Sequence, residues 1–195
     1  APSEQVDPLG AQVKRALLLS LALVFTAPAF GCAKQVGSSE AVDDVLLAYL
    51  SNARSLHHEA DLAEDGADLP KAVVALERLL AKPEPRKAPE IDEVIADTHA
   101  RVADLQSRLG QFDAAARHVT DGLSRAPAVS YFRGHLFEVR GLVEERRAKA
   151  LSAKGDTAGA AQAKDLAMKA YEEAIAIQDQ VIKNGTVQGG AGGKP

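Results

Sequence analysis

The chain has 195 residues, of which 46% are hydrophobic and 26% charged, and its formal net charge is −4. This composition is typical of one globular domain, and it excludes a disordered chain, a collagen and a protein that crosses the membrane many times. A mildly acidic chain also lacks the excess of Lys and Arg that drives phosphate binding, so we expect no nucleic-acid partner.

Residues 1–31 are interpreted as an export signal. A basic pair, Lys14-Arg15, precedes an apolar-biased run over residues 16–30. This order is typical of a secretory signal peptide, and the run is shorter than the about 20 residues that a membrane-spanning helix needs. Acidic residues precede the basic pair, where a signal does not carry them. We therefore expect the true translation start at Val13, read from an alternative start codon.

The single cysteine of the chain, Cys32, comes directly after this segment. The sequence Pro28-Ala29-Phe30-Gly31-Cys32 resembles the lipobox of bacterial lipoproteins, in which a small residue precedes a cysteine that is lipidated and becomes the first residue after cleavage. The resemblance implies a covalent lipid on Cys32, and several acyl chains anchor a protein firmly, at about 0.8 kcal/mol per buried CH₂. The alternative is a free thiol beside an ordinary signal-peptidase site.

Residues 32–40 are predicted to join the anchor to the domain. After the cysteine, Gly37, Ser38 and Ser39 give the composition of a flexible tether. In lipoproteins of enteric-type bacteria, an Asp directly after the lipidated cysteine retains the protein at the inner membrane, and here that position is Ala33. The resemblance therefore implies the outer membrane, with the domain facing the periplasm.

The remaining domain, residues 41–183, is predicted to be all-α. Apolar residues recur at steps of three and four, as in helices with one buried face, and no useful run has the two-residue period of a strand. The predicted helices are 41–63, 69–82, 91–109, 112–125, 129–154 and 157–183, and the apolar set of the last includes Ile175 and Ile182. Short connections predict three antiparallel hairpins. The Gly-rich residues 184–195 are predicted to be a flexible tail.

One segment carries a repeat pattern. Residues 110–127 read GQFDAAARHVTDGLSRAP, with a turn glycine, an aromatic residue two positions later, small residues at the helix contact and a closing proline. This resembles the second half of a tetratricopeptide repeat (TPR). Residues 67–83 and 167–177 match the same spacing more loosely. The resemblance implies that the three hairpins stack as a short TPR-like solenoid. Its last hairpin is longer, because Gly155 and Ala167 are twelve residues apart where the repeat has five, and the seven extra residues add about two helical turns.

The resemblance also implies where a ligand binds. In such stacks the first helix of each pair lines a concave face, where many family members hold peptides. The groove positions in this chain are Asp97, Arg101, Asp104, Arg108, Glu138 and Glu145. The alternative is that these residues are ordinary exposed charges.

We therefore expect a lipid-anchored adaptor, without catalysis of its own, that binds protein partners in a cell-envelope assembly such as outer-membrane biogenesis, a pilus, secretion or motility. Two alternatives are an envelope enzyme or metal-binding lipoprotein, and a purely structural subunit that self-associates as a homo-oligomer. His57 and Asp61 form an i, i+4 pair that is a weak metal candidate. We expect no metal, and no cofactor apart from the covalent lipid.

Overall fold

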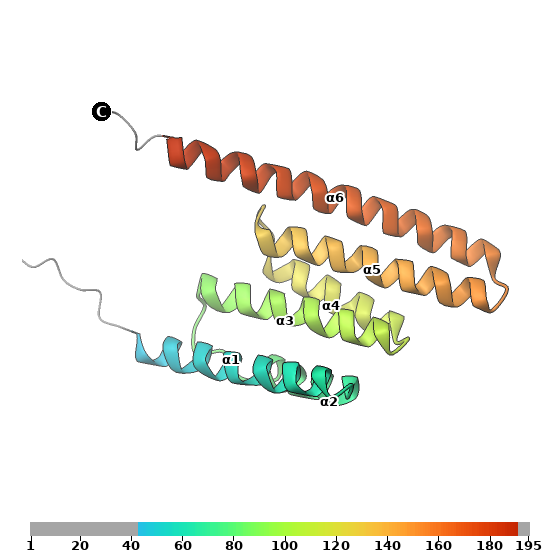
Figure 1. Ribbon diagram of the computed structural model, residues 1–195. Coiled ribbons are helices and arrows are strands. Elements are labelled where there is room, and N and C mark those ends of the chain that lie inside the picture. The colour runs from blue at the N-terminus through green and yellow to red at the C-terminus, as the bar shows by residue number, and fades with distance from the viewer. Residues whose placement is uncertain (1–42, 191–195) are drawn as a thin grey trace, which may run out of the picture. The chain divides into compact units, whose positions relative to one another are not determined.

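The computed structural model describes residues 43–190, with side chains over residues 43–185. Within this range there are six helices and no strand, which confirms the all-α prediction. The helices are α1 (Asp44–Asp65), α2 (Leu69–Leu80), α3 (Pro89–Arg108), α4 (Phe112–Arg125), α5 (Tyr131–Ala153) and α6 (Thr157–Gly190), as labelled in Figure 1. The proposed signal, Cys32 and the tether lie outside the described residues.

Local sequence signals fix several helix ends. The side chains of Asp43, Asp68 and Ser130 each accept a backbone N–H from the first turn of the helix that follows, and so cap α1, α2 and α5. Gly110 and Gly155 have φ angles of 76° and 81° in the turns after α3 and α5, a conformation that glycine adopts without steric cost. These turns are short, so each helix folds back on the one before it.

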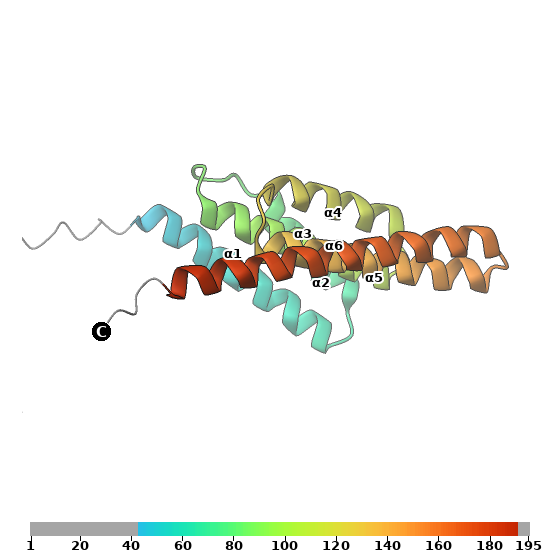
Figure 2. The same cartoon turned by 90° about the horizontal axis from the view of Figure 1, so that it is seen from above.

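Consecutive helices pack as pairs: α1 with α2, α3 with α4, and α5 with α6. The pairs follow one another in chain order, as Figure 1 and Figure 2 show from two directions. Helix α3 is central, since it packs against α1, α2, α4 and α5. Helix α6, within residues 43–190, packs against α5 alone. None of the described helices combines the length and the apolarity needed to cross a membrane.

Small residues form the interface between α5 and α6. Gly134 and Gly141 of α5 face α6 so closely that an added Cβ would lie 3.3 Å from Gln178 Cγ and 2.4 Å from the ring of Tyr171, respectively. The buried residues that line α6 are Ala160, Ala163, Ala167, Ala170, Ala174 and Ile177. The distance between two packed helices depends on the side chains at the contact, so this seam brings α5 and α6 close together.

Two details of the last helix correct the sequence analysis. Helix α6 continues to Gly190, beyond the helix end predicted at residue 183. A glycine weakens a helix by about 1 kcal/mol but does not break it as proline does, and no proline lies between residues 157 and 190. The second correction concerns Ile175 and Ile182, which are 60% and 63% exposed rather than buried. The last helix pair contains the two longest helices, of 23 and 34 residues.

Candidate functional site

Four of the six predicted groove residues lie on α3, and three of them join charge pairs with other residues. Arg101 Nη2 donates to Asp61 Oδ1 and to Glu64 Oε1 of α1, each at 2.7 Å. Arg108 Nη1 donates to Glu64 Oε2 at 2.9 Å. Glu64 is therefore shared between two guanidinium groups. The fourth residue, Asp97, is half-buried one helical turn before Arg101.

Asp104 extends these charge pairs to α5. Arg146 Nη1 donates to Asp104 Oδ1 at 2.7 Å and to Ser107 Oγ at 2.5 Å. We call the whole network the charge ladder, and its members are Asp61, Glu64, Arg101, Asp104, Arg108 and Arg146. Three carboxylates balance three guanidinium groups, so the ladder is neutral. Its charges join α1, α3 and α5 to one another.

His57 lies against the ladder in a defined tautomer. The hydroxyl of Thr98 donates to Val94 O at 2.7 Å, so at 2.9 Å from His57 Nε2 it must accept. His57 therefore carries its proton on Nε2, and Nδ1 accepts from Arg101 Nη1 at 3.2 Å. Burial, and then the charge of Arg101, lower the pKa of His57. Both ring nitrogens are engaged, and Asp61 is bound to Arg101.

Metal-binding side chains do not gather elsewhere in the part of the chain that the structure describes. There, no three His, Cys, Asp or Glu residues are arranged to hold an ion. His99 of α3 and His118 of α4, which are far apart in sequence, do meet, with their Nδ1 atoms 2.9 Å apart. One ring must donate and the other accept, so both cannot be charged in this geometry. Burial lowers the pKa of both, and that of His99 falls to about 4.

The two predicted groove residues on α5 have different neighbours from those on α3. Glu145 Oε2 accepts from the hydroxyl of Tyr171 of α6 at 3.1 Å, and Glu145 Oε1 accepts from Lys149 at 2.7 Å. The bonds from Lys149 and Tyr171 lower the pKa of Glu145, while burial and the bond to Glu145 raise the pKa of Tyr171 to about 12. Glu138 lies 3.5 Å from His135. The predicted set is thus divided: Arg101, Asp104 and Arg108 pair with residues of α1 and α5, and Glu145 pairs with Tyr171 of α6.

The sequence analysis missed a line of exposed apolar side chains on α6. Met168, Ile175 and Ile182 are 60%, 60% and 63% exposed, and they recur every seven residues. We call these three residues the outer line. A spacing of seven keeps side chains on one side of a helix, so the three residues of the outer line lie in one row along α6, about two helical turns apart. The seven-residue spacing is visible in the sequence, but it does not show which side is buried.

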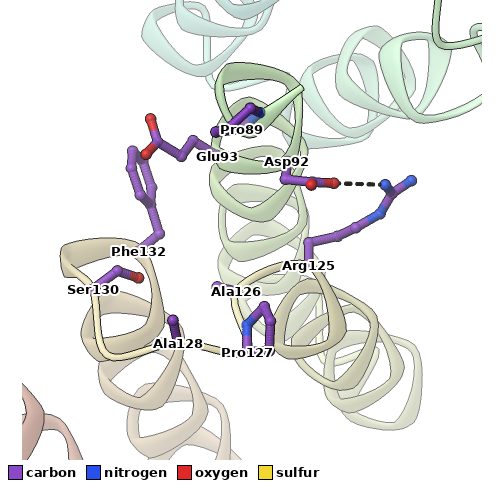
Figure 3. Close-up of a pocket in the computed structure, with 9 residues that line it drawn as sticks. All are labelled: Pro89, Asp92, Glu93, Arg125, Ala126, Pro127, Ala128, Ser130 and Phe132. Atoms are coloured by element: carbon purple, nitrogen blue, oxygen red, sulfur yellow. Dashed lines mark hydrogen bonds and ion pairs between the residues drawn. The ribbon is translucent and has the colours of Figure 1, made fainter. Parts of the chain in front are cut away.

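Figure 3 shows a small cavity where the starts of α3 and α5 meet the end of α4. Its volume is about 260 Å³, below the about 300–1,000 Å³ of common ligand pockets. Phe132 and Pro127 line it, with Glu93 beside the Phe132 ring in Figure 3. Arg125 in its wall donates to Glu84 and, at 2.9 Å, to Asp92. The guanidinium is therefore already neutralised, and none of the lining residues is a histidine, lysine or cysteine.

The candidate site is therefore described by two separate surface features, the charge ladder over α1, α3 and α5 and the outer line of α6. The ladder residues satisfy one another, whereas the outer line is exposed to solvent. Comparisons with protein-family models, with curated proteins and with solved structures find no match to this chain.

Proposed function

We propose that the protein is a lipid-anchored adaptor that binds a protein partner in a cell-envelope assembly. In this proposal the six described helices act as a short TPR-like solenoid of three stacked pairs. Cys32 carries the lipid, and the domain faces the periplasm from the outer membrane. The assembly it serves belongs to outer-membrane biogenesis, a pilus, secretion or motility.

The exposed side of α6 is the observation that carries the proposal. In helical repeats each unit contacts only its neighbours, and the terminal helix needs a polar outer face to stay soluble. Helix α6 is in the terminal position, since α5 is its only neighbour in the described range. Its outer side nevertheless bears Met168, Ile175 and Ile182. A row of exposed apolar side chains along one side of a helix is a feature of surfaces that bind other proteins, and it supports a partner on α6.

The charge ladder supports a framework role for the other helices. Arg101 and Arg108 are each bound to carboxylates of the same chain, so they are not available as a clamp for a peptide carboxylate. Apart from Asp61, which is 54% exposed, the ladder side chains are between 23% and 37% exposed, and solvent screens ion pairs at such positions less than fully exposed pairs. The ladder thus favours a rigid support formed by α1, α3 and α5. The partner is proposed to bind on α6.

Site-specific photo-crosslinking in intact membranes tests the proposal. A photoreactive side chain replaces Ile175 in one variant and Val74 of α2, which is 55% exposed, in a control variant. We expect a discrete adduct with another protein from position 175 and none from position 74. Cys32→Ser, which removes the lipid site, is expected to release the protein from membranes and to weaken the adduct.

Other outcomes would contradict the adaptor. Equal adducts from positions 74 and 175 would indicate random collisions. An adduct of two copies of this chain would favour the self-associating structural subunit instead.

A further inference from the structure

We propose that Asn184 of α6 is a site of spontaneous chemical modification, at which the side-chain amide is lost and the residue becomes aspartate or isoaspartate. The chain has two asparagines, Asn52 and Asn184, and only Asn184 is followed by a glycine. Asparagine is a thermolabile residue. The reaction needs no partner and no bound group, so the inference is independent of the adaptor function proposed above.

The reaction joins two neighbouring residues in a ring. The backbone nitrogen of Gly185 gives its proton to a base in the solvent and attacks Cγ of Asn184. The bond between these two atoms forms, the bond from Cγ to the side-chain nitrogen breaks, and that nitrogen takes up a proton and leaves as ammonia. Water then adds to one of the two carbonyls of the resulting succinimide and opens the ring. Opening at one carbonyl gives aspartate, and opening at the other gives isoaspartate.

The glycine and the exposed asparagine leave the reacting atoms accessible. Apart from the backbone of its own helix, nothing lies within 4 Å of a Cβ built on Gly185. Glycine also adopts backbone conformations that other residues reach less readily. The side chain of Asn184 is exposed, and it forms no hydrogen bond with another residue of the described range. The remaining barrier is therefore the helix itself.

Helix α6 protects this pair of residues only weakly. Within an α-helix the N–H of Gly185 is bonded to the carbonyl of Val181, so the reaction follows local opening of the helix. Gly134, in the first turn of α5, faces Gln178, and the end of α6 projects past the start of α5 (Figure 1). In the described range α5 is the only helix that packs against α6. A helix end without tertiary support opens readily, and a glycine weakens it further.

The other asparagine is an internal control. Asn52 lies within α1, and its Oδ1 accepts from Lys82 Nζ at 2.8 Å. The residue that would supply the attacking nitrogen is Ala53, which is 2% exposed. Helix α1 also packs against both α2 and α3. We therefore expect Asn52 to remain unchanged under conditions in which Asn184 reacts.

The products are expected to unwind the end of α6. The carboxylate of an aspartate is unfavourable near the C-terminal end of a helix, where the helix dipole is negative. Isoaspartate adds a CH₂ group to the backbone, so the groups that follow no longer meet their helical hydrogen-bond partners. Conversion of Asn184 therefore shortens the helix from residue 184 onward.

Peptide mapping by mass spectrometry tests the inference on the full chain in neutral detergent. During incubation at neutral pH, the peptide that contains Asn184 is expected to gain the mass that replaces NH₂ by OH and to separate chromatographically into two products. The peptide that contains Asn52 is expected to keep its mass. A higher pH is expected to speed the reaction, because base removes the proton of the attacking nitrogen. In the aged protein, amide protons at the end of α6 should exchange faster than in fresh protein.

Two variants separate the attack from the strength of the helix. Gly185→Ala is expected to slow the conversion at least about fivefold, because alanine both crowds the attacking nitrogen and adopts fewer backbone conformations. Thr186→Ala also raises helix propensity but keeps the Asn-Gly pair, so it is expected to slow the conversion less. Circular dichroism checks that both variants remain folded.

Three results would overturn the inference. One is equal conversion of Asn52 and Asn184, and another is an unchanged rate in Gly185→Ala. The third is a folded chain in which Asn184 stays intact while the same chain, unfolded in urea, is converted there. That result would show that α6 protects the site completely.

Discussion

Tyr171 of α6 lies directly over Gly141 of α5, and a Cβ built on the glycine would be 2.4 Å from the tyrosine ring. The contact lets the hydroxyl of Tyr171 reach Glu145 of α5 at 3.1 Å. A glycine in the middle of a helix lowers helix stability relative to alanine. Gly141 is therefore explained by the close approach of the second helix.

The first prediction concerns this glycine. Gly141→Ala is expected to lower the free energy of unfolding by about 1–3 kcal/mol, because the ring of Tyr171 must move and its bond to Glu145 is lost. Gly185→Ala is the matched control, since nothing lies within 4 Å of its added Cβ, and it should be neutral or stabilise by up to about 1 kcal/mol. Urea unfolding followed by circular dichroism measures both. Equal effects of the two substitutions would show that helix propensity, and not the contact with Tyr171, determines the change in unfolding free energy.

The second prediction separates the charge ladder from surface ion pairs. Arg101→Ala leaves half-buried Glu64 and His57 without one of their partners, and it is expected to cost about 1–3 kcal/mol of unfolding free energy. Arg78 and Glu59 form a pair with side chains 57% and 42% exposed, so Arg78→Ala should cost less than about 1 kcal/mol. Chemical denaturation of the two variants under one buffer compares them. A larger loss of unfolding free energy in Arg78→Ala than in Arg101→Ala would contradict the structural role that we assign to the ladder.

The third prediction is a loss of stability in acid that arises from His99 and His118. The pKa of His99 falls from 6.5 to about 4 on folding, so the unfolded chain binds the proton more readily. The stability that this group contributes is complete above about pH 6.5 and is lost as the pH falls toward 4, by at most about 3 kcal/mol. Unfolding free energies at several pH values in this window measure the loss.

Two variants isolate the histidine pair from other acid effects. His99→Gln with His118→Gln keeps polar groups at both positions but removes the titration, so its stability should fall less between pH 6.5 and pH 4 than that of the wild type. His58→Gln changes an exposed histidine and should follow the wild-type curve. Identical curves for the wild type and the double variant would contradict the assignment.

The fourth prediction concerns the tautomer of His57. Thr98→Val keeps the size of a fully buried side chain but removes the acceptor for His57 Nε2–H, so it should cost about 1–3 kcal/mol. In the wild type, nitrogen NMR at neutral pH should show the proton of His57 on Nε2. A proton on Nδ1 would exclude the bond that Arg101 donates there and would require a different arrangement of the ladder.

The helices themselves could be predicted from the sequence because their period is a local property. The segment 112–125 was predicted with the same bounds that α4 has, since Gly110 and Pro127 mark its ends. The charged residues of α3 are also visible in the sequence, but the residues with which they form ion pairs are not. Asp104 and Arg146 are 42 positions apart, and only the packing of α5 on α3 brings them together.

The outer line shows why hydropathy alone predicted that two exposed residues of α6 are buried. Ile175 is far more apolar than alanine, so a sequence pattern favours it as a buried residue, yet Ala174 is buried and Ile175 is exposed. The glycines of α5 explain this, because their surface accepts a helix that approaches closely with small side chains. That fit depends on both helices together, so it cannot be predicted from the sequence of either helix alone.

The different numbers of neighbours around the helices give the fold a gradient of local stability. Helix α3 cannot open without releasing α1, α2, α4 and α5, whereas α6 can detach by losing its contact with α5 alone. Amide protons of α6 should therefore exchange with solvent through partial opening, and those of α3 only through opening of most of the domain. A partner that covers α6 would add a second neighbour to the helix that has only one in the described range, so binding there would also slow its exchange.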